Sequence, residues 1–145
     1  MAVPVGLFAT GLITHDADMK KNALYVGESI LVSTFITTAL KNTIQRPRPF
    51  VNDPGIVPAD AAGGYSFPSG HTSEAFATAT ALSIAYPKWY VIVPSYLWAT
   101  SVGYSRMYLG VHYPSDILGG AIAGAGSAWL THKANQWLKG KKQRR

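Results

Sequence analysis

Basic and imidazole side chains recur in three short segments of the sequence. Lys41 and Arg48 lie in the first segment, Pro68-Ser69-Gly70-His71 forms the second, and the third runs from Ser105 to Asp116. Lysine supplies a compact positive charge, and the guanidinium fork of arginine matches phosphate oxygens bidentately. If the fold brings the segments together, these residue types predict a site for a phosphate or a similar oxyanion.

The second segment is typical of the start of a helix. Unpaired backbone N–H groups and the positive end of the helix dipole favour an anion there, and Gly70 lets the backbone approach a ligand closely. We therefore expect Ser69 and Gly70 to line an anion cradle. Three cations are expected to complete the cradle: Lys41, Arg48 and Arg106.

The third segment combines a histidine with a carboxylate four residues later. Asp116 reaches His112 if the segment turns helically, and Pro114 between them is tolerated in the first turn of a helix. A carboxylate that accepts from the Nδ1–H group fixes the tautomer whose Nε2 is free to attack, as in a catalytic triad. We expect His112 to be the nucleophile, Asp116 its orienting partner and His71 the general acid.

Each of these elements alone has an ordinary explanation. Lys41 by itself is more often a solvated helix end, and a lone histidine at a helix start is more often a cap or a surface residue. Their joint order and spacing favour the chemical interpretation, and here a family resemblance appears. The segments Lys41-x6-Arg48-Pro49, Pro68-Ser69-Gly70-His71 and Ser105-Arg106-x5-His112-x3-Asp116 resemble, without substitution, the signature motifs of the type 2 phosphatidic acid phosphatase and vanadium haloperoxidase superfamily.

The resemblance implies a helical bundle, a phosphohistidine mechanism at His112 with Asp116 as its partner, and no metal or other cofactor. It also implies a set of phosphate ligands: Lys41, Arg48, Ser69, Gly70, His71 and Arg106. The chain has room for about five helices, fewer than the membrane members of this superfamily have. The difference fits a missing N-terminal helix.

Four apolar stretches predict the helices that position these segments. They are Val3–Thr14, Asn22–Leu40, Ala75–Gly103 and Ile117–Thr131. The third stretch is interrupted at Pro87-Lys88, which indicates two helices joined by a tight turn. No strand-like alternation lasts long enough to build a sheet. We expect one all-α domain over residues 1–145, a bundle of about five helices that spans a membrane.

The charge pattern supports a membrane and argues against nucleic acid. Charged residues make up 14% of the chain, well below the roughly 25% of a soluble domain. Crossing helices would place Lys20-Lys21, Lys88 and the basic tail on one side, so the positive-inside rule puts the motifs on the periplasmic or exterior side of the cell membrane. The net charge is +6, but five of the thirteen basic residues lie in positions 139–145, without the footprint of a nucleic-acid site. A soluble bundle is the alternative.

Taken together, these observations predict a metal-independent phosphatase that acts on a lipid phosphate or diphosphate. A vanadium-dependent haloperoxidase and a soluble acid phosphatase would use the same site, and a catalytically inactive membrane scaffold is a third class. The sequence defines neither the lipid headgroup nor an oligomeric state. Absence of cysteine excludes disulfides and a cysteine nucleophile.

Polar residues outside the motifs receive lesser roles. Arg46 is interpreted as, at best, a neighbouring phosphate or headgroup contact. Glu28, inside an apolar helix, is expected either to pair with a motif cation or to mark a partly buried helix. Three tyrosines are expected to pack around the pocket: Tyr104, Tyr108 and Tyr113.

Overall fold

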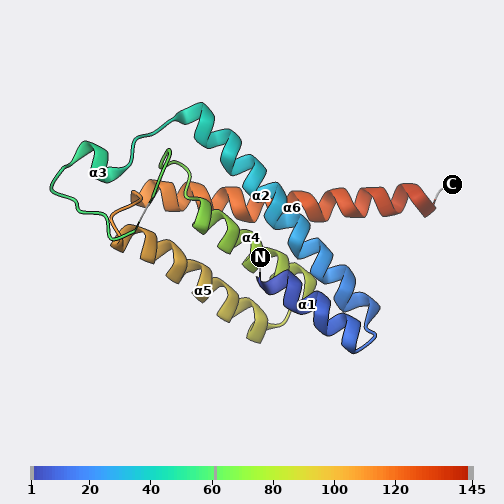
Figure 1. Ribbon diagram of the computed structural model, residues 1–145. Coiled ribbons are helices and arrows are strands. Elements are labelled where there is room, and N and C mark those ends of the chain that lie inside the picture. The colour runs from blue at the N-terminus through green and yellow to red at the C-terminus, as the bar shows by residue number, and fades with distance from the viewer. Residues whose placement is uncertain (1, 61, 144–145) are drawn as a thin grey trace.

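The computed structural model describes residues 2–60 and 62–143, and within those ranges it is helical without strands. Figure 1 shows five long helices and one short one. They are α1 (Ala2–Ile13), α2 (Ala17–Ile44), α3 (Pro49–Asn52), α4 (Gly70–Ala85), α5 (Trp89–Tyr108) and α6 (Pro114–Gln143). The expectation of an all-α bundle of about five helices is confirmed.

Local signals explain where the helices begin and end. The side chain of Asp16 caps α2 by accepting from the N–H groups of Asp18 and Met19, both at 2.9 Å. Gln45 ends α2 in the left-handed conformation, with φ of 51°. Pro114 opens α6, as expected from the tolerance of proline in a first turn. The sequence analysis predicted shorter helices than α2 and α6, because the polar ends of both helices extend beyond the apolar stretches.

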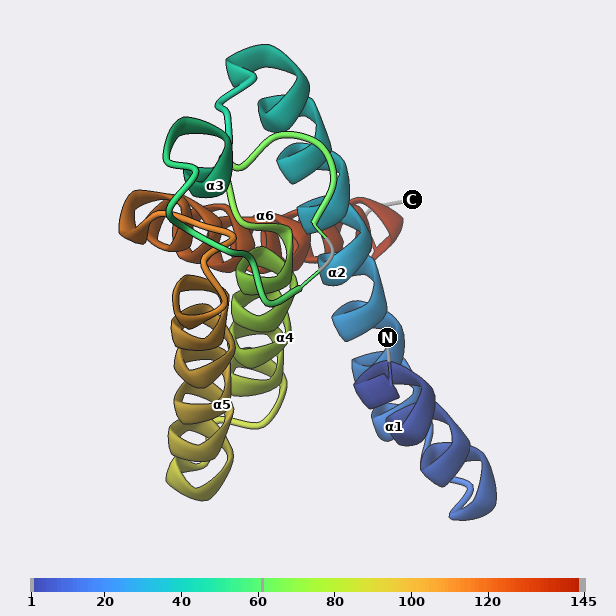
Figure 2. The same ribbon diagram turned by 60° about the vertical axis from the view of Figure 1, so that its left-hand side comes forward.

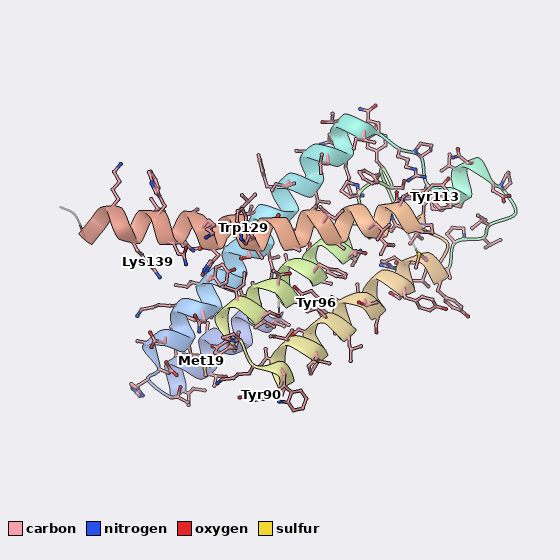
Figure 3. The ribbon with its side chains drawn as sticks, turned by 180° about the vertical axis from the view of Figure 1, so that it is seen from behind. Met19, Tyr90, Tyr96, Tyr113, Trp129 and Lys139 are labelled. Carbon is pink, nitrogen blue, oxygen red and sulfur yellow. The ribbon has the colours of Figure 1, made fainter. Side chains whose placement is uncertain are left out.

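The helix connections gather at two ends of the molecule. Figure 1 places α3, its flanking loop and the α5–α6 turn at one end, away from the α1–α2 turn, the α4–α5 turn and the C-terminal end of α6. Figure 3 shows the same separation, with Tyr113 at the α3 end and Met19, Tyr90 and Lys139 toward the other. All three motif segments therefore belong to the α3 end.

Helix α4 is the centre of the bundle and packs against α2, α5 and α6. Its buried face is built from alanines, so the neighbouring helices approach closely. Buried hydroxyls join α2 to α4: the Ser33 and Ser73 Oγ atoms are 2.5 Å apart, and Thr37 donates to Ser73 at 2.8 Å. These bonds fix the register of the two helices that carry the first and second motifs.

Large apolar side chains cover the outside of the bundle. Phe35, Trp89 and Ile122 are each about three-quarters exposed on three different helices. Among the described residues, one segment is both long and apolar enough to cross a membrane, Ala17–Asn52, which contains a stretch of 18 residues with a mean hydropathy of 1.5. An outward apolar surface of this extent suits contact with lipid or with another protein.

Two glycines allow α6 to cross α4 in direct backbone contact, near the N-terminal end of α4 (Figure 2). A Cβ atom on Gly124 would lie 2.1 Å from the carbonyl oxygen of Ser73, and one on Gly120 would lie 2.6 Å from that of Ser69. Because both obstacles are helix backbone, a larger residue would push the helices apart.

We predict that Gly124→Ala lowers the free energy of unfolding by about 2 kcal/mol or more through this overpacking. The control is Gly126→Ala in the same helix, where an added Cβ meets nothing within 4 Å. That change should be neutral or stabilise by about 0.5–1 kcal/mol through helix propensity. Thermal unfolding in detergent measures both variants, and equal stability of the two would contradict the close crossing.

Candidate active site

The three motif segments meet at two adjoining cavities at the α3 end of the bundle. The first has a volume of about 230 Å³ and is lined by Lys41, Arg48, Gly70, His71, Glu74 and His112. The second, about 210 Å³, shares Arg48, His71 and His112 with the first and adds Asp60, Gly63, Arg106 and Val111. Five of the six predicted phosphate ligands, His71 among them, and the predicted nucleophile His112 thus lie around these two cavities.

Helix ends deliver these side chains. Lys41 stands in the last turn of α2, and Arg48 immediately precedes α3. His71 lies in the first turn of α4, and Arg106 lies in the last turn of α5. His112 occupies the turn between α5 and α6. Three of the five side chains therefore stand on long helices, and a fourth, Arg48, directly precedes a short one.

His112 is buried between a donor and a carboxylate. Its Nε2 atom lies 3.4 Å from a guanidinium nitrogen of Arg48, and its Nδ1 atom lies 3.4 Å from Oδ2 of Asp116. A guanidinium can only donate, so Nε2 must present its lone pair, and Nδ1 then carries the proton toward Asp116. This is the tautomer that the sequence analysis required of a nucleophile.

Burial lowers the pKa of His112, because desolvation disfavours the imidazolium form. The hydrogen bond to Asp116 opposes this effect, whereas the charges of Arg48 and Lys41 reinforce it. The net shift is downward from the ordinary value of 6.5. His112 is consequently neutral, and able to act as a nucleophile, at neutral pH.

His71 and Arg106 form a second histidine–arginine contact. Nδ1 of His71 lies 3.4 Å from a terminal guanidinium nitrogen of Arg106, which leaves Nε2 as the ring nitrogen available to a ligand. The other terminal nitrogen of Arg106 donates to Oδ2 of Asp60 at 2.5 Å. The Asp60 carboxylate thus occupies a donor that a bound oxyanion would use.

The other two cations are held by carbonyl oxygens of the loop before α4 and of the α5–α6 turn. Lys41 donates to the Tyr65 carbonyl at 2.7 Å. Arg48 donates to the carbonyls of Gly63, Gly64 and Val111 at 2.8–3.0 Å. Carbonyls fix the positions of Lys41 and Arg48 without cancelling their charge, so both groups can bind an anion, although the carboxylate of Glu74 lines the same cavity.

The start of α4 differs in one respect from the expected anion cradle. The amide of Ser69 donates to the carbonyl of Asp116 at 3.0 Å, so it joins the second motif to the third and is not free for an anion. The helical hydrogen-bond ladder begins with the N–H of Ser73, which leaves the amides of Gly70, His71 and Thr72 outside it. The Ser69 hydroxyl accepts from Thr72 and keeps its own proton to donate.

Arg46 has a different role from the phosphate or headgroup contact that the sequence analysis allowed it, because it pairs with Asp116. It donates to Oδ1 of Asp116 at 2.8 Å and to the hydroxyl of Ser115 at 2.7 Å, and its guanidinium lies 4.0 Å from the centre of the Tyr113 ring. The signal that could have found it is charge: a buried Asp116 needs a cation, and Arg46 lies two residues from a motif arginine.

Of the two alternatives for Glu28, the structure favours the partly buried helix. Glu28 does not pair with a motif cation; it is exposed and accepts a hydrogen bond from Asn135 at 2.8 Å. The expectation for two of the tyrosines was wrong. Tyr104 and Tyr108 are 64% and 82% exposed and do not pack around the pocket.

Across residues 2–60 and 62–143, no group of three or more His, Asp or Glu side chains is arranged to hold a metal ion.

Known proteins resemble this chain in sequence and in fold. The PAP2 superfamily model matches residues 22–139. The putative undecaprenyl-diphosphatase YbjG of Escherichia coli is 35% identical over 105 residues, which cover 72% of this chain and 52% of that protein. The lipid A 4′-phosphatase of Bacteroides thetaiotaomicron is 40% identical over 75 residues, 52% of this chain and 33% of that protein. The aligned part therefore spans between a third and about half of these curated relatives.

Two solved structures share the fold. LpxE of Aquifex aeolicus superimposes with a TM-score of 0.78 at 30% identity, covering 91% of this chain and 77% of that one. A transmembrane PAP2-type phosphatidylglycerolphosphate phosphatase of Bacillus subtilis gives a TM-score of 0.69 at 26% identity, covering 93% and 76%.

We predict that Asp60→Asn tightens the binding of orthovanadate several-fold, because the anion no longer competes with a carboxylate for Arg106. Asp53→Asn is the matched control, since it removes the same charge from the same loop and keeps an oxygen for the Gly55 amide. Isothermal titration measures both affinities. Equal gains in the two variants would reduce the effect to net charge, and an unchanged Asp60→Asn affinity would contradict the competition.

Proposed function

Because this chain belongs to the PAP2 superfamily, we propose that it is a phosphatase that hydrolyses a lipid phosphate or diphosphate. The observation that carries the proposal is the place of His112, which lines both cavities together with Arg48, while Lys41 lines the first and Arg106 the second. Relatives named for lipid A and undecaprenyl diphosphate support the same substrate class. Lipid A and undecaprenyl diphosphate both carry phosphoryl groups on a lipid, and the cations of this site are suited to bind such a group.

The proposed reaction has two steps. In the first, Nε2 of His112 attacks phosphorus, a P–N bond forms, the P–O bond to the lipid breaks, and His71 gives a proton to the leaving oxygen. In the second, His71 takes a proton from water, whose oxygen attacks phosphorus as the P–N bond breaks. Inorganic phosphate leaves, and both histidines return to their starting forms.

The remaining site residues act on charge and orientation. Lys41, Arg48 and Arg106 hold the non-bridging phosphoryl oxygens, with the Ser69 hydroxyl and the Gly70 amide as additional donors. Asp116 accepts from Nδ1 of His112 and stabilises the cationic phosphohistidine. Because fixed cations supply the positive charge, the reaction is proposed to need no metal ion.

We further propose that residues 1–145 form one phosphatase domain that crosses the cell membrane several times. The helix connections at the two ends of the bundle support this topology. Lys20 and Lys21 lie in the first turns of α2 and Lys88 lies in the α4–α5 turn, at the end that Figure 1 shows away from α3. By the positive-inside rule, that end is cytoplasmic and the cavities face the periplasm or the exterior.

The two histidines should be separable by leaving group. His112→Ala should lower kcat by about 10³-fold or more on every substrate, because the nucleophile is gone. His71→Ala should cost ~100-fold or more on a lipid phosphate but under ~10-fold on p-nitrophenyl phosphate, whose leaving group needs no proton. Phosphate release is measured with a chelator present. Equal losses on both substrates would contradict the acid role of His71, and recovery by added magnesium would contradict the metal-free reaction.

The pH profile should report His112. Its neutral form is the nucleophile and its pKa is lowered, so kcat/KM should fall as the pH drops through a value below 6.5. Asp116→Asn removes the interaction that raises the pKa of His112, so the acid limb should move to still lower pH while the plateau falls. Ionisation of the substrate is common to both enzymes and cancels in the comparison. A limb that moves upward would contradict this assignment.

Topology can be tested with single cysteines, since the chain has none of its own. Val57→Cys lies in the exposed loop beside the cavities, and Gly140→Cys lies near the far end of α6. An impermeant thiol reagent applied to intact cells should label position 57 and spare position 140, and lysed cells should show both. The reverse pattern would overturn the orientation, and labelling of both in intact cells would overturn the crossing.

A further inference from the structure

The carboxylate of Asp116 has a complete set of partners, one of which stands in the spacer of the first motif, between Lys41 and Arg48. Its side chain is 0% exposed. Oδ2 accepts from the Tyr113 amide at 2.9 Å and faces Nδ1 of His112, while Oδ1 accepts from Arg46 at 2.8 Å. A buried carboxylate without a counter-charge is strongly disfavoured, and among the described residues Arg46 is the permanent cation paired with it.

Arg46 is itself held in place from three directions. Its NH1 atom also donates to the Ser115 hydroxyl at 2.7 Å, and its guanidinium plane lies over the Tyr113 ring. Its backbone carbonyl accepts from the amide of Ser66 at 2.8 Å, which ties it to the loop that leads into α4. The guanidinium therefore presents a fixed edge to Oδ1 and leaves Oδ2 turned toward His112.

The surroundings of Arg46 argue against a direct contact with substrate phosphate. It lines neither of the two cavities that Arg48 and His112 share, and its side-chain hydrogen bonds go to Ser115 and Asp116. Its side chain is 34% exposed, and it contacts Oδ1 of Asp116, whereas His112 faces Oδ2. An effect of Arg46 on the reaction would have to pass through Asp116.

We propose that Arg46 is a positioning residue, which holds Asp116 ionised and oriented so that His112 keeps its proton on Nδ1 and its lone pair on Nε2. The inference rests on the proposed function, in which Nε2 of His112 is the nucleophile. It gives a role to a spacer position of the first motif, the arginine two residues before Arg48.

Kinetics and a double-mutant cycle test this role. Arg46→Gln should lower kcat ~10-fold or more and leave KM within about 3-fold, and Arg46→Lys, which keeps the charge without the fork, should fall between it and the wild type. Combined with Asp116→Asn, Arg46→Gln should add little further loss, because both changes break one interaction. Ser115→Ala is the matched control. It removes the hydroxyl partner of Arg46 but leaves the bond to Asp116, the Tyr113 ring and the Ser66 amide in place, so it should change kcat under ~3-fold.

Each contrary outcome overturns the proposal. A rise in KM with unchanged kcat would make Arg46 a substrate contact, full additivity with Asp116→Asn would make it independent of Asp116, and unchanged kinetics would leave it no role. Thermal unfolding midpoints check that the variants are folded. If Arg46→Gln does not fold, Arg46→Lys is used in its place for the kinetic comparison.

A second readout does not depend on activity. The chain has four histidines, so ¹⁵N-histidine NMR in detergent at pH 8 is assignable with single His→Asn variants. His112 should be the Nδ1–H tautomer in the wild type, and that tautomer should lose population in Arg46→Gln but not in Ser115→Ala. An unchanged tautomer in Arg46→Gln would overturn the positioning role. A tautomer shift in a protein inactive on all lipid phosphates would instead overturn the proposed function alone.

Discussion

Asp116 carries its carboxylate at the first turn of α6, fully removed from solvent, and the arrangement of the site follows from the partners that this burial requires. Removing a charge from water is costly unless hydrogen bonds and an opposite charge replace the lost hydration. Here the replacements come from Arg46, the Tyr113 amide and His112. The main-chain oxygen of Asp116 also accepts from the Ser69 amide, so the same residue aligns α6 with the start of α4.

The helix crossing provides the rigidity that this alignment needs. Gly120 and Gly124 let α6 touch the backbone of α4 next to Ser69 and Ser73, so the two helices that carry His71 and Asp116 cannot slide independently. Hydroxyl bonds from Ser33 and Thr37 extend the same packing to α2. Small side chains and buried hydroxyls thus serve the role that large apolar side chains have in soluble cores, while the large ones face outward.

The sequence predicted the parts of the structure that local spacing determines. Helix existence followed from apolar stretches and prolines, and His112 and Asp116 are close because four residues of a helical turn bring them together. Arg46 was undervalued because its partner lies 70 residues away, and only the fold shows that the two meet. The carbonyl partners of Arg48 and the Asp60–Arg106 pair were equally beyond reach, since they depend on the path of an irregular loop. For Glu28 the sequence left two alternatives open, and only the fold decides between them, because its partner Asn135 is distant in sequence.

The proposed reaction depends most on one atom, Nε2 of His112, as the point of attack. A crystal structure of the protein with orthovanadate tests this directly, because vanadate adopts the geometry of a phosphoryl group in its transition state. We expect vanadium bonded to Nε2 of His112, with its equatorial oxygens held by Lys41, Arg48 and Arg106 and with Nδ1 donating to Asp116. Vanadate bound elsewhere, or bound in the cavity through Nε2 of His71 with His112 turned away, would contradict it.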